Sequence, residues 1–155
     1  MKVMSVVPYS TDHFGFDGRG PEIHRFLRDC DTLKEGAFPE RRKLPGRIIG
    51  VEYYWFERPE LEWVLFKKMQ VIQIVPEEVC SYWFSAHIAE RTKGIGIYVV
   101  EDSAWLRSFS QRHLASCRHF IFQFYDDIIE VIAEDLTFGS GAFRIEDHPD
   151  VSYYK

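Results

Sequence analysis

The sequence predicts an α+β fold, with a mainly antiparallel sheet of about five or six strands, built from two hairpins, and about three packed helices. Segments 47–75 and 119–138 are rich in β-branched and aromatic residues, and each is interrupted by a turn, as in a hairpin. Segments 21–30, 77–94 and 103–114 place apolar residues at helical spacing. Helices interspersed with the hairpins argue against a pure β-sandwich.

A single domain spanning residues 1–155 is expected, with residues 139–155 as an irregular C-terminal tail. The composition is 46% hydrophobic, 16% aromatic and 28% charged, which is typical of a globular protein. A chain of this length buries about 68–70% of its unfolded surface. The hydrophobic core is therefore expected to sustain folding by itself, and no disulfide, metal or other cofactor is predicted.

The net charge of -5 argues against nucleic-acid binding, which requires a basic face. Cys30, Cys80 and Cys117 are odd in number and widely spaced, without a CxxC motif, so neither a disulfide framework nor a zinc site is predicted. Apolar runs stay below the roughly 18 residues of a membrane helix, and the N-terminus lacks the apolar core of a signal peptide. We therefore expect a cytoplasmic protein without membrane contact.

In the first third of the chain, residues 2–8 read as a short strand that ends at a proline. Pro21 suits the first position of a helix. The apolar residues that follow it, at i, i+3, i+4 and i+7, predict one face of a helix over residues 21–30; they are Ile23, Phe26, Leu27 and Cys30. Residues 31–46 are expected to form a loop.

The middle of the chain predicts a long hairpin from strands at 47–57 and 62–75, with a turn between them. Lys67 and Lys68 interrupt the second apolar run and mark a bend. A helix over 77–94, a short buried strand at 95–100 and a helix over 103–114, capped by Asp102 or Ser103, follow.

The last hairpin joins strands 119–125 and 128–138 through a turn at Asp126 and Asp127. If Tyr125 lies opposite Ile128, one face is wholly apolar. The other face mixes polar and apolar pairs: Tyr125 with Ile128, Gln123 with Glu130, Ile121 with Ile132, and His119 with Glu134. A slip of one residue would lose this sorting.

The mixed face supplies the first candidate site, which comprises His119, Gln123, Glu130 and Glu134. A carboxylate beside His119 would make the imidazole more basic. Together with Cys117, the histidine and a glutamate have the residue types of a nucleophile, a base and its orienting acid. The plainer interpretation is a cross-strand ion pair on a half-exposed sheet.

The second candidate is the loop STDHFGFDGRGPEIH at positions 10–24, with Asp12, His13, Asp17 and Arg19. Its glycines match neither the dinucleotide-binding nor the P-loop pattern. It is either a strand-to-helix connection, an anion site at the expected helix start, or a divalent-cation site.

The third candidate is the aromatic run at residues 53–56 with Trp63. Strand alternation places Tyr53 and Trp55 on one face and Tyr54 and Phe56 on the other. One face belongs to the core, and the other is either covered or a docking surface, so Tyr54, Trp55 and Trp63 are binding candidates.

The sequence favours a cytosolic binding or protein-interaction domain without a recognisable catalytic centre over an enzyme. Its acidity suits a basic partner, which it would neutralise as immunity-type proteins do; self-association into a homo-oligomer is also open. The alternative is a small hydrolase-like enzyme that uses His119 with Glu134, or a metal in the Asp12, His13 and Asp17 loop.

Overall fold

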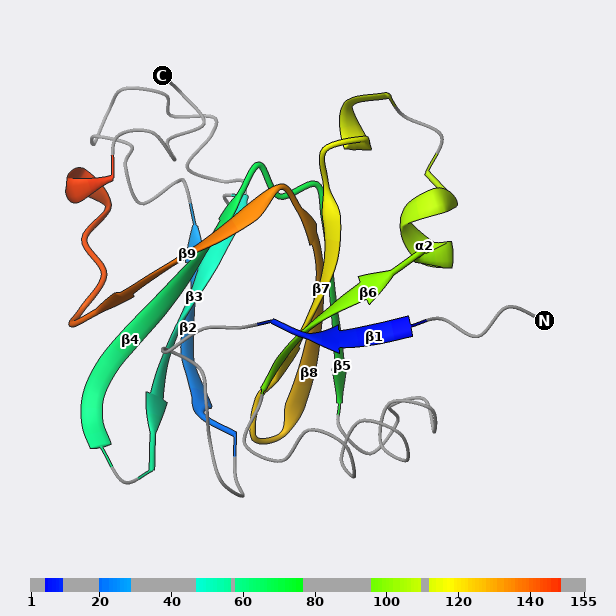
Figure 1. Ribbon diagram of the computed structural model, residues 1–155. Helices are drawn as coiled ribbons and strands as arrows, with labels where there is room; N and C mark the ends of the chain where they lie inside the picture. Colours follow the sequence, from blue (N-terminus) through cyan, green and yellow to red (C-terminus); the bar gives the residue numbers. More distant parts are fainter. Residues whose placement is uncertain are drawn as a thin grey trace.

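The computed structural model describes residues 5–9, 20–28, 47–56, 58–76, 96–109 and 112–148. Within these residues the chain forms nine strands in two antiparallel sheets (Figure 1). The helical elements of this part of the chain are one short helix and two 3₁₀ turns. The predicted α+β fold is therefore wrong, because the described residues build a β-sandwich in which helices contribute little.

The five-stranded sheet has the order β1-β6-β7-β8-β5. Its strands are β1 (Ser5–Pro8), β5 (Val71–Pro76), β6 (Ile97–Glu101), β7 (Arg118–Gln123) and β8 (Asp127–Ala133). The four-stranded sheet has the order β2-β3-β4-β9. Its strands are β2 (Glu22–Arg28), β3 (Ile48–Trp55), β4 (Arg58–Lys67) and β9 (Asp135–Ser140). The helical elements are α2 (Ala104–Arg107) and the 3₁₀ turns Arg112–Leu114 and Ile145–Asp147.

The main core lies between the inner faces of the two sheets. Alternation along each strand turns every second side chain inward, so Val51, Tyr53 and Trp55 of β3 face the core, and the latter two share one face, as predicted. From the other sheet β7 contributes Phe120 and Phe122 to the same cluster. Aromatic side chains from both sheets thus form a large part of the described core.

The chain passes between the two sheets in the β4–β5 and β8–β9 connections, and these two connections lie side by side. The chain leaves β4 and enters β5 at Lys68, which has a φ of 50°, and it passes from β8 to β9 at Glu134. The Glu134 N–H donates to the Lys67 carbonyl at 2.8 Å, and its carboxylate lies 3.6 and 3.4 Å from the Lys67 and Lys68 ammonium groups. The predicted bend at these lysines is confirmed, and residues 71–75 lie in the other sheet from their predicted hairpin partner.

The predicted helix over residues 21–30 is wrong, since residues 22–28 form β2 at the edge of the four-stranded sheet. The pairing with β3 shifts between Ile23 and Arg25, which indicates a β-bulge. Ile23 and Phe26 consequently pack against the main core, three positions apart, while Leu27 is buried on the opposite face.

The C-terminal segment covers part of the outer face of the four-stranded sheet. Phe143 packs there with Trp63 in a second cluster, at a ring distance of 5.4 Å. Gly139 pairs with Trp63 and lies so close to the indole that a Cβ would collide with it. The buried Glu52 carboxylate accepts hydrogen bonds from Arg25 Nε at 2.9 Å and from the Phe143 N–H at 2.8 Å, which anchors this segment.

Other predicted elements have mixed outcomes. The strands predicted at 2–8 and 95–100 are confirmed, as far as the structure describes these residues, by β1 and β6. The helix predicted over 103–114 is reduced to α2, capped by Ser103, and a separate 3₁₀ turn. The helix predicted over 77–94 and the loop at 31–46 lie outside the described residues. In the described part of the chain, no helix has the length and apolarity needed to cross a membrane.

Candidate functional site

The β7–β8 hairpin carries the first candidate site, but in a different register from the one predicted. His119 lies opposite Ile132, and Ile121 lies opposite Glu130. The predicted pairing of His119 with Glu134 is therefore wrong by a shift of two residues. Such a shift leaves every side chain on its predicted face, so the His119 face of the hairpin still carries Glu130 and Gln123.

His119 is the centre of a chain of hydrogen bonds that is buried at Ser103 and exposed at Gln73. Its Nε2 lies 2.9 Å from Oε1 of Glu130, and its Nδ1 lies 2.7 Å from the hydroxyl of Ser103. Gln73 of β5 donates from Nε2 to the other carboxylate oxygen of Glu130 at 3.2 Å. The Trp105 ring of α2 packs on the imidazole at 5.0 Å. This chain ties α2 to the outer face of β7, β8 and β5.

The partners of the imidazole determine which atoms carry protons. Glu130 is the acceptor facing Nε2, so the neutral ring carries its proton there, and the Ser103 hydroxyl donates to Nδ1. The Ser103 oxygen also accepts the Leu106 N–H at 3.1 Å. His119 is only 2% exposed and Ser103 3% exposed. A serine, a histidine and an acid are the residue types of a hydrolytic triad, but here the serine lies at Nδ1 and the acid at Nε2, the reverse of that arrangement, and each polar atom already has a protein partner.

Glu134 and Gln123 lie apart from this chain. Glu134 contacts the two lysines at the corner between the sheets. Gln123 is half-buried at the end of β7, where its N–H donates to the Gly96 carbonyl at 2.8 Å. The structure thus brings together His119 and Glu130 from the predicted set, and adds Ser103 and Gln73.

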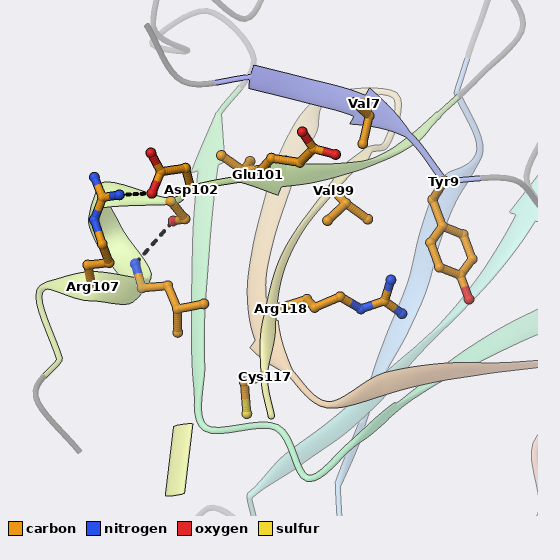
Figure 2. Close-up of a pocket in the computed structure, with 11 residues that line it drawn as sticks. Val7, Tyr9, Val99, Glu101, Asp102, Arg107, Cys117 and Arg118 are labelled. Carbon is orange, nitrogen blue, oxygen red and sulfur yellow. Dashed lines mark hydrogen bonds and ion pairs between the residues drawn. The ribbon is translucent and has the colours of Figure 1, made fainter. Parts of the chain in front are cut away.

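A pocket of about 740 Å³ opens beside this chain, between β1, β6, α2 and the start of β7 (Figure 2). Apolar side chains and four charged ones line it; the lining includes Val7, Tyr9, Val99, Glu101, Asp102, Leu106, Arg107 and Arg118. Ser103 and Cys117 also contribute to its wall. Burial raises the pKa of the Cys117 thiol, with a further increase from Glu134, so the thiol stays protonated.

A second surface feature lies at the end of the sandwich where the β3–β4 and β7–β8 turns meet. Phe56 contacts Tyr125 at a ring distance of 5.0 Å and Tyr54 at 6.4 Å. Phe56 is 49% exposed, and both tyrosines are half-buried. We call these three residues the aromatic tip.

Acidic side chains border the aromatic tip. The Tyr54 hydroxyl donates to Glu22 Oε2 at 2.9 Å, which raises the pKa of the phenol. Asp126 is exposed in the β7–β8 turn, and Asp127 is half-buried beside it. Arg58, a cation of the β3–β4 turn, lies over the Trp55 ring at 5.6 Å, and the His24 ring lies 6.4 Å from the Tyr54 ring. Among the described residues beside the aromatic tip, acidic side chains therefore outnumber basic ones.

The two tryptophans proposed for binding lie inside the protein. Trp55 faces the main core and donates from Nε1 to Glu62 Oε2 at 2.8 Å. Trp63 is covered by Phe143 and by His148, whose ring lies 4.9 Å away. Of the aromatic candidates, Tyr54 is the one on an accessible surface.

The loop candidates Asp12, His13, Asp17 and Arg19 lie outside the described residues. The two ends of that loop are fixed, because the Tyr9 N–H donates to the Ile97 carbonyl and the Tyr125 N–H donates to the Pro21 carbonyl, each at 2.9 Å. Among the residues that the structure describes, no group of three or more His, Cys, Asp or Glu side chains is arranged to hold a metal ion.

Sequence reasoning missed Ser103 as a partner of His119 and Phe56 and Tyr125 as a joint surface. The first required the packing of α2 on the sheet, and the second required knowing that two turns from different sheets meet. Comparisons with protein-family models, curated proteins and solved structures find no match.

Proposed function

We propose that this chain is a cytosolic protein-interaction domain that docks its aromatic tip onto a basic surface of a partner protein. The observation that carries this proposal is the contact between Phe56 and Tyr125, which presents aromatic surface from two sheets at one end of the sandwich. Loops gathered at one end of a β-sandwich are a common location for binding surfaces.

The chemistry of the tip supports an interface. Aromatic side chains provide large contact areas with few rotatable bonds, and they are enriched among the residues that dominate binding energy. Phe56 is the most exposed of the large apolar side chains described, at 49%. Removing such a ring from water on binding contributes free energy in proportion to the apolar area buried.

The negative charge around the aromatic tip supports a partner with a basic surface. Glu22, Asp126 and Asp127 border the tip, and the whole chain carries a net charge of -5. Complementary charge steers encounter with a basic surface and disfavours acidic partners. A basic protein is therefore a better match than a second copy of this acidic chain.

Affinity capture from the source cell, with three versions of the protein, tests the proposal. Phe56→Ser removes the ring at the centre of the tip, and Ile74→Ser is the matched control, because Ile74 is 45% exposed on β5. We expect a partner of high isoelectric point that the wild type and Ile74→Ser retain, that Phe56→Ser loses, and that elutes as salt increases. Identical capture by all three versions would remove the basis for the proposal. Light scattering on the purified protein would show whether the chain forms a homo-oligomer.

The hydrogen-bonded Ser103–His119–Glu130 chain favours a second candidate, a serine hydrolase. The burial of Ser103 and its bond with the Leu106 N–H count against it, since an attacking hydroxyl needs access to its substrate. A fluorophosphonate probe tests whether Ser103 is a nucleophile. Covalent labelling of Ser103 in the native protein would support the hydrolase. If neither the wild type nor Ser103→Ala is labelled, the hydrogen bonds between Ser103, His119 and Glu130 have a structural role.

A further inference from the structure

The pocket beside β1 contains two charges that lie next to each other across neighbouring strands. Val100 of β6 pairs with His119 of β7, so the next residues outward, Glu101 and Arg118, are opposite each other. Both side chains line the pocket, on the same face as Val99 and Phe120. Figure 2 shows Glu101 between Asp102 and Val7, and Arg118 extending toward Tyr9.

Arg118 is held in position but has donors to spare. Its guanidinium carbon lies 5.0 Å from the Phe120 ring and 5.9 Å from the Tyr9 ring, so cation–π contacts orient it. One nitrogen contacts Asp135 Oδ1 at 3.4 Å, and that same oxygen also accepts the Leu136 N–H. A guanidinium has five N–H donors and suits a carboxylate in a bidentate geometry.

The other two charges of the pocket neutralise each other. Arg107 Nη1 forms an ion pair with Asp102 Oδ1 at the side of α2 (Figure 2). Arg118 also forms an ion pair with Asp135, so a ligand would meet Glu101 and those guanidinium donors of Arg118 that Asp135 does not use. The wall beside them is apolar, with contributions from Val7, Val99 and the Tyr9 ring.

We propose that this pocket binds a small zwitterion with an apolar side chain, such as a free apolar amino acid. The carboxylate would lie on Arg118, the ammonium group beside Glu101, and the side chain along the wall formed by Val7 and Val99. The volume of about 740 Å³ lies within the range of small-molecule sites, about 300–1,000 Å³. The site is distinct from the aromatic tip, so it does not depend on the proposed function.

Isothermal titration calorimetry with matched probes tests this assignment. L-phenylalanine carries both charges, 3-phenylpropanoate lacks the ammonium group, and phenethylamine lacks the carboxylate. We expect saturable binding of L-phenylalanine, about threefold weaker binding of the carboxylate alone, and at least about tenfold weaker binding of the amine, because the bond to the guanidinium is charge-assisted.

Two variants assign the charges. Arg118→Gln should weaken L-phenylalanine at least about tenfold, while Glu101→Gln should remove the advantage of L-phenylalanine over 3-phenylpropanoate. Methyl NMR on the wild type gives a readout that needs no variant, with shifts expected at Val7, Val99 and Leu106. Binding of the amine as tight as that of L-phenylalanine, an unchanged affinity in a folded Arg118→Gln, or no methyl shifts at millimolar ligand would each overturn the proposal.

Discussion

The ring of Phe56, in the β3–β4 turn, meets the ring of Tyr125, in the β7–β8 turn, at a centroid distance of 5.0 Å and an interplanar angle of 74°. These turns belong to different sheets, so the contact joins the two sheets at one end of the sandwich. An edge-to-face pair of this kind has both a stabilising role and, through its exposed side, a surface role.

A double-mutant cycle with Phe56→Leu and Tyr125→Leu should give a coupling free energy of about 0.5 kcal/mol, at the low end for aromatic pairs because Phe56 is half exposed. Urea unfolding of the four proteins measures it. Additive effects of the two substitutions would show that the rings contribute independently to stability.

Glu130 and Glu134 lie close together in sequence, but their surroundings predict different contributions to the free energy of unfolding. Glu130→Gln replaces a charge-assisted bond to the buried His119 by a neutral one, and we expect a loss of about 1–2 kcal/mol of unfolding free energy. Glu134→Gln removes contacts with two exposed lysines, and we expect a loss below about 0.5 kcal/mol.

Chemical denaturation of both variants measures the difference. Long-range ¹⁵N–¹H NMR of the wild type should also show His119 protonated on Nε2, opposite Glu130. A larger loss in Glu134→Gln than in Glu130→Gln would favour the register predicted from the sequence, and equal losses would contradict the special role of Glu130.

Glu52 anchors the C-terminal segment, so its charge should matter more than that of an exposed glutamate. Glu52→Gln weakens the bonds from Arg25 and the Phe143 N–H, and we expect a loss of about 1.5–3 kcal/mol. The control is Glu146→Gln, which alters a solvent-exposed pair with Arg144 and should leave the free energy of unfolding nearly unchanged. Thermal melts should separate the two, and Trp63 fluorescence should change only in Glu52→Gln.

Tyr53 makes stability depend on alkaline pH. Burial raises the pKa of its phenol, and repulsion by Glu62 raises it further. An unfolded tyrosine loses its proton near about pH 10, whereas the folded one keeps it, so its contribution to stability is complete below pH 10 and decreases above it.

The unfolding free energy of the wild type should therefore fall more steeply than that of Tyr53→Phe as the pH rises from 9 to 11. Urea titrations at several pH values, taken as the difference between the two proteins, cancel the other titrating groups. Parallel curves would show that Tyr53 ionises as readily in the folded state as in the unfolded one.

The error at β2 has a physical cause. A β-bulge inserts an extra residue between Ile23 and Arg25, so inward-facing residues stand three apart instead of two. Leu27 is buried too, because the C-terminal segment covers the outer face. A bulge in a strand with apolar residues on both faces thus reproduces helical spacing, and only the tertiary structure distinguishes the strand from a helix.

The hairpin register shows a similar limit. Alternation predicted correctly which β7 and β8 residues share a face, because a period of two fixes sidedness. It leaves shifts of two residues undetermined, and the turn lies one residue earlier than expected, since Gln123 pairs with Ile128 and the Phe124 N–H donates to the Asp127 carbonyl. His119 was therefore assigned to the right face but the wrong glutamate, and Ser103, distant in sequence, was missed.

The crossing of strands at Lys68 and Glu134 also bears on the order in which the protein can fold. Neither sheet consists of consecutive strands: the four-stranded sheet combines β2, β3 and β4 with β9, far along the chain, and the five-stranded sheet combines β1, at the start, with β5 to β8. Such long-range pairing slows folding and keeps strand edges open. During synthesis, β2, β3 and β4 would emerge as an unfinished sheet, and the chain would complete both layers only when residue 140 has left the ribosome.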